Sequence, residues 1–451
     1  MARRYASGYD SLPDLSGPLH VSSAERSYAM QFAQIYDYRL SVLRRRVLTA
    51  ATEQFGEKPP YVERILDTPP RQRCFVIGTL YAHMKHKPDV LQEIAREASL
   101  PPQQVVSYAD PEYDELYIED QSGRVRLVGA RDRMHCVTGA VVGVLGIETP
   151  DGDLDVLDMV APGPPPPLSL GNIPQRLPDA PGAPSIVLTS GLCMGNAAPE
   201  QDMYHALLLE YLTGELGTPE MRAQASCISS IVLAGDSVRR AAWCDPIIAA
   251  ERQKHRAAMQ SPFADLDPVL EELCATLDSV ILMPGMQDPS SATMPQQPLL
   301  RALMPRAARW SSLECVTNPA WFMLHGRIML GTAGQNVADL VKYAPEAAQS
   351  IETAMEMARA TLEWSHVAPT APDTLWCYPF KHTDPFVLRA APDVYIVGNQ
   401  AAHAHSTMNT KRADGTLHTI HIILVPDFSQ THEVVLLNME TLASHPVAFQ
   451  A

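Results

Sequence analysis

Residues 185–195 read SIVLTSGLCMG, residues 230–237 read SIVLAGDS and residues 280–288 read VILMPGMQD. Each segment is a short apolar run, rich in Ile, Val and Leu, that ends in a loop containing glycine. Such runs are typical of strands that are buried on both faces of a sheet. Helical segments at 200–212 and 266–277 separate them, and alternating strands and helices predict an α/β fold. We expect this domain over residues 184–451, with further strands at 321–330, 394–397, 419–425 and 434–438.

The loops that follow these strands are where an α/β sheet binds its ligands. Their order and spacing resemble the calcineurin-type metallophosphoesterases, whose strand ends carry D-x-H, G-D, G-N-H-D and G-H-x-H. In that family these residues hold two metal ions, which activate a water molecule and stabilise the phosphoryl oxygens. The resemblance places the corresponding ligand positions at Gly191, Cys193, Asp236, Met286, Gln287, Ala333, Asn399 and Ala401.

These eight positions lack the ligands that the phosphoesterase reaction requires. Hard and borderline divalent cations are bound by carboxylates and imidazoles, and Asp236 is the one such side chain among the eight. We therefore predict an inactive, calcineurin-like phosphoesterase α/β sandwich with no catalytic residue, no metal ion and no cofactor. Asp236 itself is interpreted as a cap or hydrogen-bond acceptor at a strand end.

An active metal-dependent phosphodiesterase is the alternative. A rearranged metal site would use Asp236 and Asp288 together with His403 and His405, whose imidazoles would lie on one side of an extended chain. The more ordinary interpretation of His403 and His405 is a surface histidine pair. A nucleotide-binding loop at 191–195 is disfavoured, because neither G-K-[ST] nor G-x-G-x-x-G is present.

Composition limits the classes of function. The 451 residues carry a formal net charge of −16, and 46% are hydrophobic, so the chain can bury a substantial core. Proteins that grip duplex DNA generally present a basic face, so we predict little direct DNA binding. The eight cysteines include no C-x-x-C pair, which favours reduced thiols in a cytosolic or nuclear protein. The sequence contains no run of about 18 apolar residues, so no membrane span is predicted. The first ten residues lack the apolar core of a secretory signal.

Upstream of the α/β domain the sequence predicts a tail and a helix. Residues 1–21 are rich in Ser, Gly and Pro and predict a flexible tail. A helical segment follows over 22–68, with a capping box of Ser22 and Glu25, an apolar stripe at three- and four-residue steps, and Gly56 at its end. The basic residues of this helix are interpreted as a solvated face: Arg44, Arg45 and Arg46.

Residues 69–162 change to short β-rich segments with one predicted helix at 88–98. Five short strands predict a small barrel, for which the OB-fold is the obvious type. Few aromatic residues and the acidic stretch 110–120 favour a barrel that binds protein over one that binds single-stranded DNA. A Pro-rich connector is predicted at 163–183, because proline lacks the N–H donor that a sheet requires. The predicted strands lie at 74–80, 115–119, 124–128, 137–148 and 154–160.

A phosphoesterase fold without ligands, preceded by an OB-fold, resembles the B-subunits of eukaryotic replicative DNA polymerases. Local strings narrow the resemblance to the small subunits of polymerase delta, and their fixed order spans roughly residues 70–430. A B-subunit of polymerase alpha or epsilon is the alternative within the same family. The strings are TMPQQPL (293–299), VTNP (316–319), GTAGQNV (331–337), APTAPDTL (368–375), CYPF (377–380), TDPF (383–386) and VPDFS (425–429).

The resemblance implies a non-catalytic accessory subunit that acts in the nucleus. Such a subunit would bridge the C-terminal cysteine-rich domain of the catalytic polymerase chain and a third subunit, which leads on to the sliding clamp. A fold that keeps its core, lacks metal ligands and carries net negative charge suits a docking scaffold.

Overall fold

The computed structural model describes residues 8–22, 26–88, 105–110, 112–129, 136–168, 182–195, 199–239, 252–412 and 414–450. The chain divides into two compact units, each built from separate stretches of sequence. Unit 1 comprises Met1–Ser23, Pro167–Gln335 and Pro392–Ala451. Unit 2 comprises Ala24–Pro166 and Asn336–Ala391. Residues 336–391 therefore belong by their contacts to unit 2, whereas the sequence placed them in the α/β domain over 184–451.

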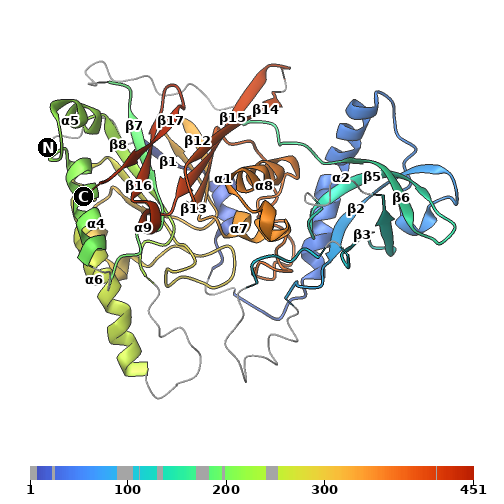
Figure 1. The fold of residues 1–451 in the computed structure, drawn as a ribbon, viewed down its shortest axis with the longest axis horizontal. Helices are drawn as coiled ribbons and strands as arrows, with labels where there is room; N and C mark the ends of the chain where they lie inside the picture. The colour runs from blue at the N-terminus through green and yellow to red at the C-terminus, as the bar shows by residue number, and fades with distance from the viewer. Residues whose placement is uncertain are drawn as a thin grey trace. The chain divides into compact units, whose positions relative to one another are not determined.

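Unit 1 contains two six-stranded sheets (Figure 1). The Ile-, Val- and Leu-rich runs form a parallel core of four strands, and two antiparallel strands extend it. The order of this first sheet is β10 (Leu313–Cys315), β9 (Ser279–Met283), β8 (Ile228–Ala234), β7 (Ser185–Thr189), β16 (Glu433–Asn438) and β17 (Ser444–Ala448). The order of the second is β1 (Tyr9–Ser11), β11 (Ala320–Leu324), β12 (Arg327–Thr332), β13 (Val394–Gln400), β15 (Leu417–Pro426) and β14 (Ala404–Lys411).

The two sheets pack face to face. Leu188, Val232 and Ile281 of the first sheet share one buried apolar cluster with Ile396 and Ile423 of the second. A second cluster lies on the opposite face of the first sheet, beneath three helices (Figure 1). The predicted strands are thus present, but they belong to two stacked sheets rather than to one. The single strand predicted at 321–330 is wrong, because these residues form the antiparallel pair β11 and β12. The three helices are α4 (Pro199–Thr213), α5 (Pro219–Ala225) and α6 (Arg252–Thr276).

The predicted flexible tail is wrong for residues 8–21, which are an integral part of unit 1. Tyr9 pairs with Leu324, so β1 adds an edge strand to β11. After α1 (Pro13–Ser16) and η1 (Gly17–Leu19), the side chain of Leu19 is fully buried. The amide of Gln297 donates to the Leu19 carbonyl oxygen at 3.0 Å and accepts from the backbone N–H of Val21 at 2.9 Å.

Unit 2 contains a closed five-stranded barrel, which confirms the predicted small barrel. All neighbouring strands are antiparallel except β4 and β6. The predicted helix at 88–98 lies almost entirely outside the described residues. The barrel order is β2 (Arg73–His83), β3 (Glu115–Glu119), β4 (Arg124–Val128), β6 (Leu154–Val160) and β5 (Val141–Glu148).

The helix before the barrel is α2 (Ala33–Phe55), whose apolar stripe packs on the barrel strands. It ends as predicted at Gly56, which adopts a left-handed φ of 69°. The predicted start at Ser22 is wrong, because residues 26–32 are not helical. There the backbone N–H of Ser27 donates to the hydroxyl of Tyr378 at 3.0 Å, so a contact far along the chain competes with helix formation.

The prediction that Arg44, Arg45 and Arg46 of α2 form a solvated face holds only for Arg45. Arg44 donates to the Tyr61 hydroxyl, and Arg46 donates to the carbonyl oxygens of Leu388 and Gly163. Arg45 alone of the three is exposed. Two of the three basic side chains therefore hold α2 to its neighbours within unit 2.

The buried guanidinium of Arg39 joins three stretches of unit 2. Its Nε donates to Asp384 Oδ2 at 2.8 Å, and its Nη1 donates to the carbonyl oxygens of Gly139 at 2.9 Å and Pro369 at 2.8 Å. Its Nη2 donates to the carbonyl oxygen of Ala371 at 2.8 Å. Arg39 and Asp384 are both fully buried. Because a buried charge is tolerated only when it is paired and hydrogen-bonded, this network fixes α2, the barrel and residues 366–391 in one arrangement.

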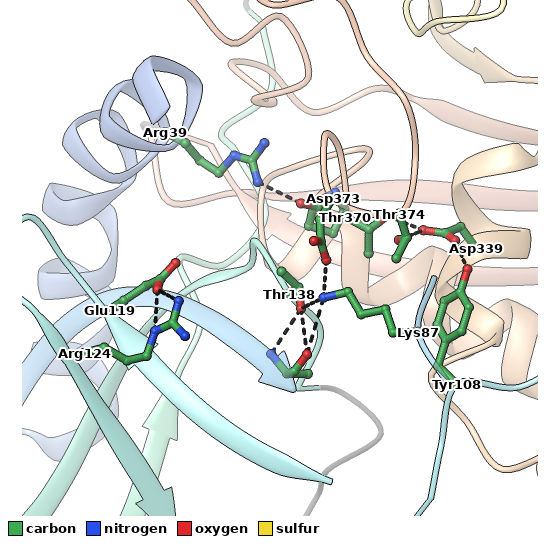
Figure 2. Close-up of polar contacts among 12 residues, drawn as sticks. Arg39, Lys87, Tyr108, Glu119, Arg124, Thr138, Asp339, Thr370, Asp373 and Thr374 are labelled. Atoms are coloured by element: carbon green, nitrogen blue, oxygen red, sulfur yellow. Dashed lines mark hydrogen bonds and ion pairs between the residues drawn. The ribbon is translucent and has the colours of Figure 1, made fainter. Parts of the chain in front are cut away.

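A second polar cluster joins residues 336–391 to the barrel (Figure 2). Asp339 accepts hydrogen bonds from the hydroxyls of Tyr108 at 2.9 Å and Thr370 at 2.6 Å. Lys87, just after β2, pairs with Asp373. The remaining helices among the described residues are η2 (Ile65–Asp67), α7 (Gln335–Val341), η8 (Glu346–Ala348) and α8 (Ile351–Glu363) in or bordering unit 2, and η6 (Arg301–Leu303), η7 (Ala307–Arg309) and α9 (Phe428–Thr431) in unit 1. Among the residues described, none of the helices combines the length and apolar character needed to cross a membrane.

We predict that Arg39→Met destabilises unit 2 by about 3–5 kcal/mol, because it leaves the buried carboxylate of Asp384 unpaired. Urea denaturation together with hydrogen exchange of residues 136–145 measures the effect. The control is Arg45→Met on the exposed side of the same helix, which should change the free energy of unfolding by less than about 0.5 kcal/mol. Equal losses in the two variants would show that the network does not hold unit 2 together.

The stability of unit 2 is also expected to depend on His366. Its Nδ1 accepts the backbone N–H of Ala368 at 3.2 Å, so the ring is neutral and its Nε2–H donates to Asp384 at 2.8 Å. Burial, and then the charge of Arg39, lower the pKa of His366 to about 4. In the unfolded chain this pKa is about 6.5, so between these values the unfolded chain binds the extra proton.

The free energy of unfolding should therefore rise as the pH is raised from about 4 to 6.5, by up to about 1.4 kcal/mol per pH unit from this group. Urea denaturation between pH 4.5 and 7.5 measures the slope, which His366→Gln should reduce. The matched control is His382→Gln at an exposed position. A slope that His366→Gln leaves unchanged contradicts the assignment of a neutral, buried imidazole.

Candidate functional site

The loops at the ends of the unit 1 strands meet at one rim, and they carry the positions singled out from the sequence. The backbone N–H of Gly191, after β7, donates to the carbonyl oxygen of Gly235, after β8, at 3.0 Å. Asn399 at the end of β13 donates through Nδ2 to the carbonyl oxygen of Ala333, after β12, at 2.9 Å. The structure therefore brings these loops together, as the sequence predicted.

The loop after β9 joins the same rim. The backbone N–H of Gln287 donates to Asp236 Oδ1 at 2.6 Å. Its neighbour Met286 is 67% exposed, so its side chain projects into solvent. Ala401 is also exposed, in the turn after β13. Asp236 thus accepts a hydrogen bond that links two loops.

Carboxylates dominate the electrostatics of the rim. Asp288 is buried and accepts the backbone N–H groups of Gly285 at 2.8 Å and Val238 at 2.9 Å. Burial raises the pKa of Asp236 to about 7, and the neighbouring charges of Asp288 and Asp427 contribute to this rise. Burial also raises the pKa of Asp288 to about 6. Close carboxylates with raised pKa values are an arrangement that disfavours full ionisation.

Cys193 is not set up as a nucleophile. Burial, followed by the charges of Asp427 and Asp236, raises the pKa of its thiol to about 12. The thiolate is the reactive form of cysteine, and reactive cysteines lie in electropositive surroundings. At neutral pH the Cys193 side chain is therefore a protonated thiol beside two acids.

The space beside Gly191 is filled by the chain itself. A Cβ atom at Gly191 would lie 2.2 Å from Asp427 Oδ1 and 3.0 Å from Asn399 Oδ1, and the residue has a φ of +66°. Asp427 is held there as the cap of α9, where its carboxylate accepts the backbone N–H of Ser429 at 2.9 Å. A carboxylate side chain at position 191 therefore does not fit unless Asp427 moves.

The backbone of the rim is strained at three non-glycine residues. Cys193, Asp236 and Asn399 have φ values of 49°, 55° and 54°. Such left-handed conformations cost of the order of 1–3 kcal/mol each and persist only where the surroundings hold them in place. Such conformations tend to cluster at functional sites.

A network of side-chain amides, in which Asn318 and Gln296 are buried and Gln335 is half-buried, holds the rim loops to one another. Asn318 Nδ2 donates to Gln296 Oε1 and to Gln335 Oε1, both at 2.8 Å, and Asn318 Oδ1 accepts the backbone N–H of Ala333 at 3.1 Å. Gln335 Nε2 donates to Gln296 Oε1 at 2.9 Å, and Gln296 Nε2 donates to the carbonyl oxygen of Gly285 at 2.9 Å. These amides link the loop after β9, the start of β11 and the turn after β12.

The sequence did not identify the amide network or the role of Asp427. Gln296, Asn318 and Gln335 lie in the strings TMPQQPL, VTNP and GTAGQNV, and Asp427 lies in VPDFS. The signal was therefore present in those strings, but the contacts join residues far apart in sequence. They become visible only when the loops are placed together.

His403 and His405 form a separate, half-buried group. Both imidazoles lie 3.0 Å from the hydroxyl of Ser444, and His405 Nε2 lies 3.0 Å from His421 Nδ1. These histidines therefore bond away from Asp236 and Asp288, whose partners are backbone N–H groups of the rim. Over the described ranges of the chain, no group of three or more His, Cys, Asp or Glu side chains is placed to hold a metal ion. The described residues of the rim thus do not supply the ligands of the dimetal centre that the phosphoesterase resemblance implies.

Comparison with known proteins gives two family matches. The family of the B-subunits of DNA polymerases alpha and epsilon matches residues 186–406. The family described as DNA polymerase delta subunit OB-fold domain matches residues 31–159, which contain α2 and the barrel. The second match confirms the predicted OB-fold.

Full-length relatives are similar to nearly the whole chain. The DNA polymerase delta small subunit of Arabidopsis thaliana is 35% identical over 423 residues, which cover 93% of this chain and 91% of the relative. The DNA polymerase delta small subunit of Saccharomyces cerevisiae is 32% identical, and the match covers 97% of this chain and 93% of the relative. DNA polymerase delta subunit 2 of Drosophila melanogaster is 34% identical and covers 94% of both chains.

We predict that the amide network stabilises unit 1 as one cooperative group. Asn318→Ala and Gln335→Ala should each lower the free energy of unfolding by about 1–3 kcal/mol, because each leaves buried amide groups unpaired. The double variant should lose less than the sum of the two, with a coupling of about 0.5–3 kcal/mol measured by urea denaturation. The exposed amide of Gln430 provides the control, Gln430→Ala, which should have little effect. Strictly additive losses would mean that the amides act independently.

Proposed function

The chain belongs to the family of DNA polymerase delta small subunits, and on this premise we propose that it is a docking scaffold built on an inactivated calcineurin-like phosphoesterase fold. It bridges the C-terminal cysteine-rich domain of the catalytic polymerase chain and the third subunit, and through that subunit it is linked to the sliding clamp. It works in the nucleus, in DNA replication and repair synthesis, and makes little direct contact with DNA.

The single observation that carries this proposal is the filled rim of unit 1. Phosphodiester hydrolysis by this type of fold requires metal ligands at the strand ends. Here Asp427 occupies the space beside Gly191, and the amides of Gln296, Asn318 and Gln335 link the loops. Several of the positions that would hold ligands take part in internal hydrogen bonds, among them Gly191, Asp236 and Asn399.

The arrangement of the chain also supports a scaffold. Residues 8–22 add an edge strand to unit 1, and residues 336–391 pack with the barrel through Arg39 and Asp339. Each unit is thus completed by a segment distant in sequence, which suits a protein whose surfaces must keep a fixed shape. Its net charge of −16 disfavours a DNA-gripping role.

The positions of the histidines disfavour the alternative of an active metal-dependent phosphodiesterase. It requires His403 and His405 to join Asp236 and Asp288, whereas both histidines bond to Ser444. The alternative of a polymerase alpha or epsilon B-subunit is disfavoured by the delta relatives, which match more than nine-tenths of the chain.

Co-expression tests the scaffold. The full chain should co-elute in size-exclusion chromatography with the C-terminal domain of the polymerase delta catalytic chain, and with the third subunit when that is added. The C-terminal domains of the alpha and epsilon catalytic chains are the matched controls and should elute separately. Preference for alpha or epsilon, or no complex with any of the three, contradicts the proposal.

We also predict that restoring the first ligand pair does not restore a metal site. Gly191→Asp combined with Cys193→His should lower the free energy of unfolding by about 1–3 kcal/mol. The new side chain at position 191 would clash with the Asp427 carboxylate, and the residue would have to keep a left-handed φ. Manganese binding measured by calorimetry should remain absent. Ala401→His is the control, since this exposed position has room for an imidazole. Stoichiometric manganese binding with phosphodiesterase turnover in the double variant would show that the rim is open.

A further inference from the structure

Three histidines lie at one edge of the apolar layer between the two sheets of unit 1. On β15, His421 alternates with Ile423 and Val425, which belong to the buried cluster between the sheets. Successive side chains of a strand point to opposite faces, so His421 lies on the face of the second sheet that looks toward the first. On β17, Ser444 pairs with Leu437, another member of that cluster. The strands β14 and β17 are the outermost strands of their sheets (Figure 1), and polar side chains line this edge of the layer.

A chain of contacts joins these polar side chains across the two sheets. His403 Nε2 and His405 Nδ1 each lie 3.0 Å from Ser444 Oγ. His405 Nε2 lies 3.0 Å from Nδ1 of His421, and the centroids of these two rings are 5.2 Å apart. All four residues are half-buried. We name His403, His405, His421 and Ser444 the histidine cluster.

The contact between His405 and His421 limits the number of protons that the histidine cluster can hold. A neutral imidazole has one N–H group and one bare nitrogen, whereas an imidazolium ion has two N–H groups. A hydrogen bond between His405 Nε2 and His421 Nδ1 therefore requires at least one of the two rings to be neutral. When both rings are charged, two N–H groups face each other and two positive charges repel at close range. The contact is then lost.

The surroundings of the histidine cluster favour neutral rings. Burial lowers the pKa of His405. Burial also lowers the pKa of His421, and the charge of His405 lowers it further. Burial, followed by the charges of His405 and His445, lowers the pKa of His403. The other charged and titratable groups that act on His421 are Arg327 of β12 and His418 of β15, which lower its pKa, and Asp393, which raises it.

We propose that the histidine cluster is a proton-sensitive contact between β14 and β17, which holds the edges of the two sheets together at neutral pH and releases them on acidification. With neutral rings, Ser444 of the first sheet is bonded to His405 of the second, and His405 is bonded to His421. Protonation of both rings breaks this chain of contacts, and the two edges separate. Deeper in the layer the contacts are apolar and do not titrate, so the separation is local. The inference concerns this chain alone and goes beyond the proposed function.

The direction of the pH dependence follows from the lowered pKa values. An imidazole at a released edge has an ordinary pKa of about 6.5, so below that pH the released state binds more protons than the closed state. The closed state is therefore fully favoured above pH 6.5 and loses its advantage as the pH falls toward the lowered values. Exclusion of one proton corresponds to about a tenfold change in the opening equilibrium between pH 7.5 and 5.5, and exclusion of two protons to about a hundredfold change.

Hydrogen exchange of the purified full chain at pH 7.5 and 5.5 tests the proposal, with exchange rates corrected for their intrinsic dependence on pH. The protection of residues 404–411 and 444–448 against exchange should fall at least about tenfold at pH 5.5. The protection of the central strands β8 and β9 should fall less, because these strands lie away from the edge that carries the histidine cluster.

Four variants separate titration from the simple loss of a contact. His421→Gln and His405→Gln each leave a single ring at the contact, so the loss of edge protection between pH 7.5 and 5.5 should shrink to less than about threefold. Ser444→Ala removes the bridging hydroxyl and should lower the protection of residues 444–448 at both pH values. The control is His382→Gln at an exposed position of unit 2, which should behave like the unmodified chain. Thermal midpoints at pH 7.5 establish that each variant is folded.

Edge protection that does not depend on pH overturns the inference. It is also overturned if both glutamine variants keep the full pH dependence of the unmodified chain, or if β8 and β9 lose as much protection as the two edges. None of these results involves another subunit, so each of them leaves the proposed function standing.

Discussion

The carboxylate of Asp427 lies in the space beside Gly191, where a ligand-bearing side chain would otherwise project into the rim of unit 1. This position is fixed by the role of Asp427 as the cap of α9 and by its place directly after β15. The adjoining loops are linked by the amides around Asn318. Internal hydrogen bonds hold the strained backbone at Cys193, Asp236 and Asn399.

In unit 2, too, buried polar groups hold separate segments of the chain together. The guanidinium of Arg39 donates hydrogen bonds to backbone carbonyl oxygens of the barrel and of residues 366–391. Its positive charge is paired with the carboxylate of Asp384. His366 must be neutral to fit between Asp384 and the Ala368 amide. Such groups add little net stability compared with an apolar core, but they penalise any arrangement that separates them. For a scaffold, whose surfaces must keep one shape, this penalty is the useful property.

Much of the fold could be predicted because its signals are local. The Ile- and Val-rich runs near 185, 230 and 280 identify strands, and Gly56 marks the end of α2. The division into two sheets is not local, since β7 pairs with β16 about 250 residues later. The strand β1 has only three residues and no pattern of its own, and Ser27, which lies before the start of α2, contacts Tyr378 far along the chain. At the rim the sequence indicated which positions matter, whereas Asp427, the amides and Arg39 depend on partners far along the chain.

If the protein's own side chains close the rim of unit 1, manganese has no site there. The thermal midpoint of the purified full chain, measured at manganese concentrations from 0.1 to 10 mM, tests this closure, because any ion that binds the folded state alone must raise that midpoint. We expect a midpoint that does not change with manganese. A midpoint that climbs with concentration, and loses this rise in Asp236→Ala, would contradict it.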